Sequence, residues 1–211
     1  MYGAIIAIGI LISALLAEKL TIKDKKSASV IWNALFISLI AGVVGARLYH
    51  VLDYWDIYSK NITLIFLTTT GGLGVLGGLI AGLSTFYIYL KLTKNDLKYY
   101  FNLAGTVIPL AQAIGRWANF FNNELYGVRG HPIFLYESLL NLILFGFLYK
   151  NYTKGKNFYY YLLGYGLIRY FLEFFRQNPW TFYNLNVAQM ISILFIITAY
   201  VNLYRLRSRG L

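Results

Sequence analysis

The sequence predicts an all-α polytopic membrane protein, and its composition, the length of its apolar blocks and the placement of its charges support that class. Apolar residues make up 58% of the 211 residues and charged residues 13%, whereas soluble domains average roughly 45–50% and about 25%. The apolar residues fall in blocks of about 16–25, and roughly 20 residues span a bilayer as a helix. The chain has no cysteine and only two histidines, which excludes a disulfide scaffold and a cluster of thiolate or imidazole metal ligands.

Seven apolar blocks follow one another along the chain, and we expect each to form a membrane-spanning helix. No internal repeat, low-complexity tract or linker separates them, so residues 1–211 are predicted to form a single integral membrane domain. The blocks cover residues 2–17, 30–52, 74–92, 103–121, 133–149, 158–175 and 187–204.

The basic residues are concentrated in alternate gaps between these blocks, with thirteen in one set of gaps and three in the other. Cytoplasmic loops carry the excess of lysine and arginine, so the pattern predicts an outer N-terminus and a cytoplasmic C-terminus. The net charge of +11 therefore reflects topology, and we expect no nucleic-acid partner. The thirteen are Lys19, Lys23, Lys25, Lys26, Lys91, Lys94, Lys98, Lys150, Lys154, Lys156, Arg205, Arg207 and Arg209, and the three are Lys60, Arg129 and Arg176.

A glycine-rich run interrupts the third block, with six glycines in residues 71–82 after the apolar, β-branched stretch 62–70. Glycine weakens a helix, and in a membrane it also lets two helix backbones approach closely. The run is therefore compatible with a helix-packing face or with a re-entrant or half-helix segment that exposes backbone amides.

Ionisable side chains inside the apolar blocks are the main functional signal, because a charge within a bilayer is costly. With the predicted topology, four blocks place such residues near their outer ends. Two sets share a helical face, since their spacings follow i, i+3 or i+4. The first set is Arg116, Asn119 and Asn123, the second is Tyr165, Arg169, Glu173 and Arg176, and the other residues are Arg47, His50, Glu124, His131, Tyr136 and Glu137.

Two arginine-bearing faces suit an anion, because guanidinium groups bind phosphate and carboxylate in a bidentate manner. The anion that the membrane itself supplies is the phospholipid headgroup, and amide side chains nearby would suit its hydroxyl groups. The alternative is structural, with Arg169–Glu173 and Arg116–Glu124 as internal ion pairs that hold the helices together.

Three segments resemble motifs of the prolipoprotein diacylglyceryl transferase family. Residues 115–127 read G-R-W-A-N-F-F-N-N-E-L-Y-G and closely resemble the family signature G-R-x-x-N-F-x-N-x-E-x-x-G. Residues 131–138 are similar to its H-P-x-x-L-Y-E segment, and residues 165–176 to its Y-G-x-x-R-x-x-x-E-F-x-R segment. The matches are collinear over essentially the whole chain, which is thereby identified as a member of this family.

The resemblance implies an activity, partners and site residues. Members transfer the diacylglyceryl group of phosphatidylglycerol to the lipobox cysteine of a preprolipoprotein signal peptide, within the bilayer of the bacterial inner membrane, and release glycerol phosphate. No cofactor and no metal is implied. Arg116 and Arg169 would neutralise the phosphate, and His131 would accept the thiol proton, because Leu76 stands where the family often has a histidine. Substrate contacts would come from Tyr2, Arg116, Asn119, Asn122, Glu124, Gly127, Tyr136, Glu137, Tyr165, Glu173 and Arg176.

Two further expectations concern how far the resemblance extends. The family usually carries an outer head domain between residues 127 and 131, which is essentially absent here. A non-catalytic relative that binds or translocates anionic phospholipid would use the same arginines, so it remains an alternative. A transporter would show paired half-repeats and charges at the bilayer midplane, and the sequence contains neither pattern.

Overall fold

The computed structural model describes residues 2–66, 71–152, 155–177 and 179–208. The protein is built almost wholly from helices, in agreement with the predicted all-α class. It divides into two compact units, which we call the larger unit (residues 1–23 and 98–211) and the smaller unit (residues 24–97).

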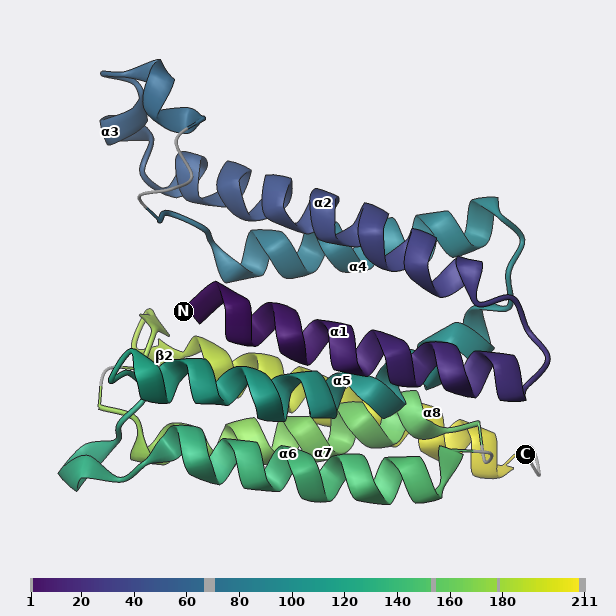
Figure 1. Cartoon of the computed structure of the whole chain (residues 1–211). Coiled ribbons are helices and arrows are strands. Elements are labelled where there is room, and N and C mark those ends of the chain that lie inside the picture. The colour runs from purple at the N-terminus through teal and green to yellow at the C-terminus, as the bar shows by residue number, and fades with distance from the viewer. Residues whose placement is uncertain (1, 67–70, 153–154, 178, 209–211) are drawn as a thin grey trace. The chain divides into compact units, whose positions relative to one another are not determined.

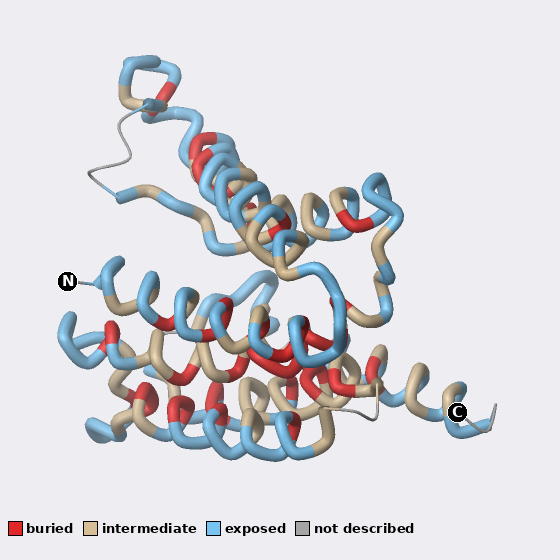
Figure 2. Tube along the Cα trace, turned by 45° about the vertical axis from the view of Figure 1, so that its right-hand side comes forward, coloured by how far each residue is buried: buried red, intermediate tan, exposed pale blue. Residues whose placement is uncertain are grey.

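The larger unit is a bundle of five long helices that run side by side (Figure 1). Buried positions lie on the faces that these helices turn toward one another, and many exposed positions lie on their other faces (Figure 2). One core cluster contains Leu148, Tyr161, Leu162 and Ala199. The exposed faces carry large apolar residues such as Ile143, as expected for helices that face lipid. The helices are α1 (Tyr2–Lys23), α5 (Leu97–Phe121), α6 (Ile133–Lys150), α7 (Asn157–Leu172) and α8 (Val187–Ser208).

Short elements connect these helices at the end where α5 finishes and α6 begins. The strands β1 (Thr181–Phe182) and β2 (Leu185–Asn186) pair in an antiparallel hairpin between α7 and α8. The two hairpin-turn residues have φ values of 48° and 64°, which suits a two-residue turn between twisted strands. The 3₁₀ turns η2 (Val128–Gly130) and η4 (Glu173–Phe175) lie at the same end of the bundle.

The smaller unit is a helix pair, and its glycines form the contact between the two helices. A Cβ on Gly77 would collide with the backbone carbonyl of Gly45, so glycine permits the close approach. This contact supports the packing role expected for part of the glycine-rich run. Residues 71–74 are not helical, and residues 67–70 of the predicted apolar stretch lie outside the described residues. The elements are α2 (Ser29–Asp53), α3 (Trp55–Tyr58), η1 (Ile62–Ile65) and α4 (Val75–Leu92).

Within the described part of the chain, five helices, α1, α2, α4, α6 and α8, have the length and hydropathy to cross a membrane, which supports the prediction of a helical membrane protein. The predicted count of seven spans is not confirmed, because α5 and α7 are not among the five. Helix α7 has 16 residues, and α5 carries polar side chains such as Asn102, Gln112 and Arg116 along its 25 residues.

A network of buried amides ties α5 to the start of α7, near the Leu97 end of α5. The Asn157 Nδ2 group donates to Thr106 Oγ1 at 2.8 Å and to the Leu148 carbonyl at 2.6 Å. The Asn102 Oδ1 atom accepts a hydrogen bond from the backbone N–H of Phe158 at 3.1 Å. The charged residues within the apolar blocks lie toward the other end of these helices. The sequence analysis rested on those charges and did not predict this neutral network.

Candidate active site in the larger unit

The fully buried carboxylate of Glu137 brings together helices α5, α6 and α7. Its Oε1 atom lies 2.6 Å from Arg116 Nη2, and its Oε2 atom lies 3.5 Å from Arg169 Nη1. The Glu137 side chain has no exposed surface, whereas the Arg116 and Arg169 side chains are 24% and 14% exposed. The two arginines expected to act on phosphate therefore share one carboxylate.

A second buried carboxylate, Glu173, extends the group toward the end of α7. Its Oε2 atom lies 2.7 Å from Arg169 Nη2, and its Oε1 atom lies 3.5 Å from Arg176 Nη1. We call Arg116, Glu137, Arg169, Glu173 and Arg176 the ionic cluster. Three guanidinium groups face two carboxylates here, which leaves one net positive charge.

The ionic cluster is under-satisfied as well as positively charged. Among the described residues, the buried Arg116 Nε atom has no hydrogen-bond partner, and the two buried Glu173 oxygens have ion-pair partners but no hydrogen bond. A buried donor without an acceptor costs roughly 1–3 kcal/mol, so it favours occupation of the cluster by a group that accepts hydrogen bonds. An anion with several oxygen atoms meets both requirements.

The ion-pair alternative considered at the sequence level needs one correction. Arg169 pairs with Glu173, as that alternative expected. Arg116 pairs with Glu137, because α6 runs antiparallel to α5 and carries Glu137 to the level of Arg116. Glu124 instead accepts long hydrogen bonds of 3.4 Å from Asn119 Nδ2 and Asn122 Nδ2.

Two tyrosines expected at the site lie near Arg116. Tyr165 lies one turn before Arg169 in α7 and interacts electrostatically with Arg116. Tyr2, at the start of α1, also lies within electrostatic reach of Arg116, and its side chain is partly exposed. Phenol groups from α1 and α7 therefore lie near the Arg116 guanidinium.

The amides that follow Arg116 in the sequence lie at the end of α5. Asn119 is buried, whereas Asn122 and Glu124 are exposed. Asn123 does not continue the predicted helical face, because α5 ends at Phe121 and Asn123 has a left-handed φ of 53°. Asparagine tolerates that conformation and commonly ends helices.

Gly127 acts through its backbone. Its N–H donates to the His131 carbonyl at 2.7 Å, and its carbonyl accepts a hydrogen bond from Gln177 Nε2 at 2.9 Å. A Cβ at this position would collide with the Phe175 carbonyl. Gly127 thus lets the α5–α6 connection lie against residues 175–176, at and after the end of η4. It forms a β-bridge with Arg176.

His131 lies beside the ionic cluster in sequence but outside its network of ion pairs. Its ring is exposed, and Nδ1 lies 3.5 Å from the Tyr136 hydroxyl. The structure therefore places His131, the expected base, and Tyr136 at the start of α6. Glu137, which binds both arginines, is the next residue after Tyr136.

Arg47, which the sequence analysis grouped with the other intramembrane charges, has a different environment in the smaller unit. Its guanidinium donates to four backbone carbonyls and lies 5.2 Å from the centre of the Tyr58 ring. The bonds hold residues 64–65 and 71–72 against α2. The acceptors are the carbonyl oxygens of Leu64, Ile65, Gly71 and Gly72, the last three at 2.9, 3.0 and 2.8 Å.

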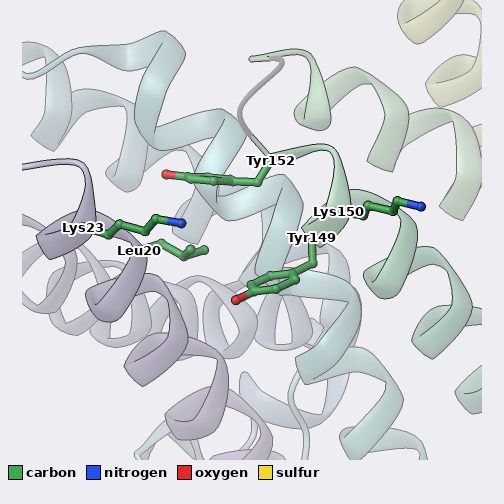
Figure 3. A pocket seen from close by; sticks show the side chains of 5 residues that line it. All are labelled: Leu20, Lys23, Tyr149, Lys150 and Tyr152. Atoms are coloured by element: carbon green, nitrogen blue, oxygen red, sulfur yellow. The ribbon is translucent and has the colours of Figure 1, made fainter.

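A surface pocket of about 170 Å³ lies at the opposite end of the larger unit. Lys23 extends toward the other lining side chains, whereas the ammonium group of Lys150 points away (Figure 3). The pocket lies at the last turns of α1 and α6, whereas Tyr2 and Glu137 lie near their first turns. It is therefore separate from the ionic cluster. Its lining residues are Leu20, Lys23, Tyr149, Lys150 and Tyr152.

Three polar residues next to the ionic cluster were missed at the sequence level. Gln112, Asn141 and Tyr161 each lie four residues, or one helical turn, from Arg116, Glu137 and Tyr165. The spacing of one helical turn was the signal that could have identified these three residues. Their side chains are neutral, so this signal is weaker than that from the arginines.

The helical fold and the ionic cluster define an all-α membrane protein that holds an arginine-rich, under-satisfied site inside its bundle. A family model described as prolipoprotein diacylglyceryl transferase matches residues 1–205. The chain belongs to the prolipoprotein diacylglyceryl transferase family.

Individual relatives agree with this membership. A phosphatidylglycerol–prolipoprotein diacylglyceryl transferase of Finegoldia magna is 36% identical over 95% of this chain and 88% of its own length. A relative with the same name from Clostridium botulinum (strain Loch Maree / Type A3) is 36% identical over 97% of this chain and 91% of its own length. One from Streptococcus equi subsp. zooepidemicus is 31% identical over 100% of this chain and 92% of its own length.

Proposed function

We propose that this protein transfers the diacylglyceryl group of phosphatidylglycerol to the lipobox cysteine of a preprolipoprotein. The observation that carries the proposal is the ionic cluster, whose three guanidinium groups face only two carboxylates. A phosphodiester has one negative charge and several acceptor oxygens, which match the excess positive charge and the unpaired Arg116 Nε–H. The names of the relatives support the same lipid and the same acceptor protein.

Arg116 and Arg169 act on the phosphate in this mechanism. The cysteine sulfur attacks the glyceryl carbon that is bonded to the phosphate oxygen, so a C–S bond forms as that C–O bond breaks. Both electrons of the C–O bond leave with glycerol phosphate. The guanidinium groups stabilise this developing charge, which is usually a large contribution to catalysis. The product is a thioether on the acceptor protein.

His131 accepts the thiol proton and releases it to water on the exposed side of its ring. An imidazole is suited to this step near neutral pH, and Tyr136 restrains the ring through Nδ1. The other expected substrate contacts are assigned by position. Asn119, Asn122 and Glu124 lie at the end of α5 toward the lipid headgroup, and Tyr2, Tyr165, Glu173 and Arg176 surround the phosphate.

The proposed topology has seven spans, with α5 and α7 crossing inside the bundle where their polar faces are covered. The N-terminus is outside and the C-terminus is cytoplasmic in a bacterial inner membrane, as the alternation of basic gaps supports. The two units act as one integral membrane domain without an outer head between residues 127 and 131. The glycine-rich run supplies a half-helix or re-entrant segment. Lipid and signal peptide arrive laterally from the bilayer.

The direct test is transfer from radiolabelled phosphatidylglycerol to a synthetic lipobox peptide by the full-length protein in lipid nanodiscs. We expect label on the peptide with cysteine and none on the matched peptide with serine in its place. If the folded protein binds phosphatidylglycerol but transfers no label to several lipobox peptides, the transferase proposal is wrong. The non-catalytic lipid-binding relative would then be favoured, with the same arginines as its binding site.

A further inference from the structure

A layer of polar side chains lies one helical turn from the ionic cluster, toward the middle of the bundle helices. We call Gln112, Asn141 and Tyr161 the mid-bundle polar layer. Gln112 lies four residues before Arg116, and Asn141 lies four residues after Glu137. One turn of an α-helix rises about 5.4 Å, so the layer is closer to the bilayer midplane than the cluster by roughly that distance.

Contacts between helices tie this layer to the cluster. Gln112 Nε2 donates to the Tyr161 hydroxyl oxygen at 3.0 Å. The Tyr161 ring stacks on the Tyr165 ring, with centroids 5.7 Å apart and planes inclined by 15°. The Ser138 hydroxyl donates to the Ala113 carbonyl at 2.9 Å, which brings α5 and α6 together between the cluster and the layer.

The hydrogen-bonding capacity of the layer is only partly used. Asn141 is fully buried, and among the residues that the structure describes neither its Nδ2 nor its Oδ1 atom has a hydrogen-bond partner. Gln112 Oε1 is likewise buried and unpaired. By contrast, the Nδ2 group of Asn157, which is buried to the same degree, donates two hydrogen bonds. An unpaired buried amide is costly, so Asn141 is poised for a polar partner that enters from outside the chain.

We propose that the mid-bundle polar layer is a subsite for the ester carbonyl groups of the diacylglyceryl moiety. This assignment rests on the proposed function, in which the lipid phosphate occupies the ionic cluster. The ester carbonyls of a phospholipid lie a few bonds from phosphorus on the side of the acyl chains. They therefore lie deeper in the bilayer than the phosphate does, by about the rise of one helical turn.

The donor groups of the layer match this occupant, whereas the unpaired Asn141 Oδ1 and Gln112 Oε1 atoms are acceptors that an ester does not pair. Ester carbonyls only accept hydrogen bonds, and Asn141 Nδ2 is an unpaired donor. The Tyr161 oxygen accepts from Gln112, which leaves the Tyr161 hydroxyl proton to be donated. The hydroxyl groups of the lipid headgroup extend from the phosphate in the opposite direction, toward the end of α5. The layer thus distinguishes a diacyl lipid from its ether-linked analogue, which lacks the carbonyls.

The test compares diacyl phosphatidylglycerol with its dialkyl ether analogue, for both transfer and thermal stabilisation of the full-length protein. We expect the wild-type protein to prefer the diacyl lipid by roughly tenfold, the factor for one hydrogen bond of average strength. Asn141→Leu should bring that ratio close to one. It should not lower the unfolding temperature, because it removes an unpaired buried amide.

The matched control is Asn157→Leu, which removes a buried amide whose Nδ2 group donates two hydrogen bonds. It should lower the unfolding temperature and leave the diacyl-to-ether ratio of the folded protein unchanged. Tyr161→Phe deletes one hydroxyl group and should also lower the diacyl-to-ether ratio. This variant provides the test if Asn141→Leu does not fold. Equal use of both lipids by the wild-type protein, or an unchanged ratio in folded Asn141→Leu and Tyr161→Phe, would overturn the subsite.

The thermal measurement separates this inference from the transferase proposal. If no lipid supports transfer, the transferase proposal fails. A rise in unfolding temperature that is larger with the diacyl lipid than with its ether analogue would still support the ester subsite, provided that Asn141→Leu abolishes the difference. An equal rise with the two lipids would contradict the subsite.

Discussion

Arg47 in the smaller unit and Arg116 in the larger unit both lie in helices of 25 residues, but their donors have different partners. Arg47 donates to four backbone carbonyls of its own unit. Arg116 binds one carboxylate oxygen and keeps a buried Nε–H without an acceptor. A guanidinium has five N–H donors, so the partners already present determine how much of it remains for a ligand.

The difference shows why an arginine within a membrane is not by itself a binding site. The Arg47 donors replace the hydrogen bonds that non-helical backbone would otherwise lack in a bilayer. The Arg116 side chain instead belongs to a group with one excess positive charge. Substitutions can test this contrast, because loss of Arg47 should affect folding and loss of Arg116 should affect chemistry.

The largest expected effect is that of Arg116→Ala or Arg169→Ala on transfer. Each should lower the rate from phosphatidylglycerol by about a thousandfold, as expected for a lost group that stabilises developing charge. The protein should remain inserted, because Glu137 keeps one arginine partner in either variant. Arg116→Lys keeps the charge but loses the planar fork, so it should recover only part of the rate. Full activity of either alanine variant would remove the site assignment.

The next effect concerns His131, which lies outside the ion pairs of the cluster. His131→Ala should lower the transfer rate by roughly a hundredfold, the usual contribution of a general base. The measurement is the rate of label transfer to the lipobox peptide in lipid nanodiscs. Phosphatidylglycerol binding should not change. A normal rate would exclude His131 as the base and leave the arginine assignments intact.

Arg47→Ala should act on stability. It removes the donor of four part-buried backbone carbonyls and should cost about 3 kcal/mol of folding free energy, visible as a lower unfolding temperature in detergent. The transfer rate per folded molecule should stay close to that of the wild-type protein. If Arg47→Ala unfolds at the wild-type temperature but loses most of the transfer rate, Arg47 contributes to transfer and the contrast with Arg116 is wrong.

The smallest effect is expected for Arg176→Ala. Its side chain is 36% exposed, and Nη1 lies 3.5 Å from the Glu173 carboxylate. The buried Glu173 carboxylate keeps its closer partner, Arg169 Nη2 at 2.7 Å, so the rate should fall by roughly two- to fivefold, about 0.4–1 kcal/mol, mainly through weaker binding of lipid. A loss as large as that of Arg169→Ala would show that Arg176 contributes as much to the phosphate site as Arg169 does.

Much of the architecture followed from the sequence, because the bilayer imposes strong local rules. Apolar block length and charge indicated a helical membrane protein, and the motif at residues 115–127 indicated the family that the comparisons support. The i, i+4 spacing placed Arg169 and Glu173 together, since that pairing depends only on the geometry of one helix.

Contacts between helices depended on packing that the sequence does not specify. Only the antiparallel arrangement of α5 and α6 made Glu137 the partner of Arg116 in place of Glu124, which is closer in sequence. Arg47 could be separated from Arg116 only after the backbone carbonyls of Ile65 and Gly72 were placed around it. The unpaired amide of Asn141 is also a tertiary property, because a buried polar group is satisfied or not according to the neighbours that packing supplies. The sequence by itself therefore determined the helices and the charged faces, and the tertiary structure decided which of those charges remain available to a substrate.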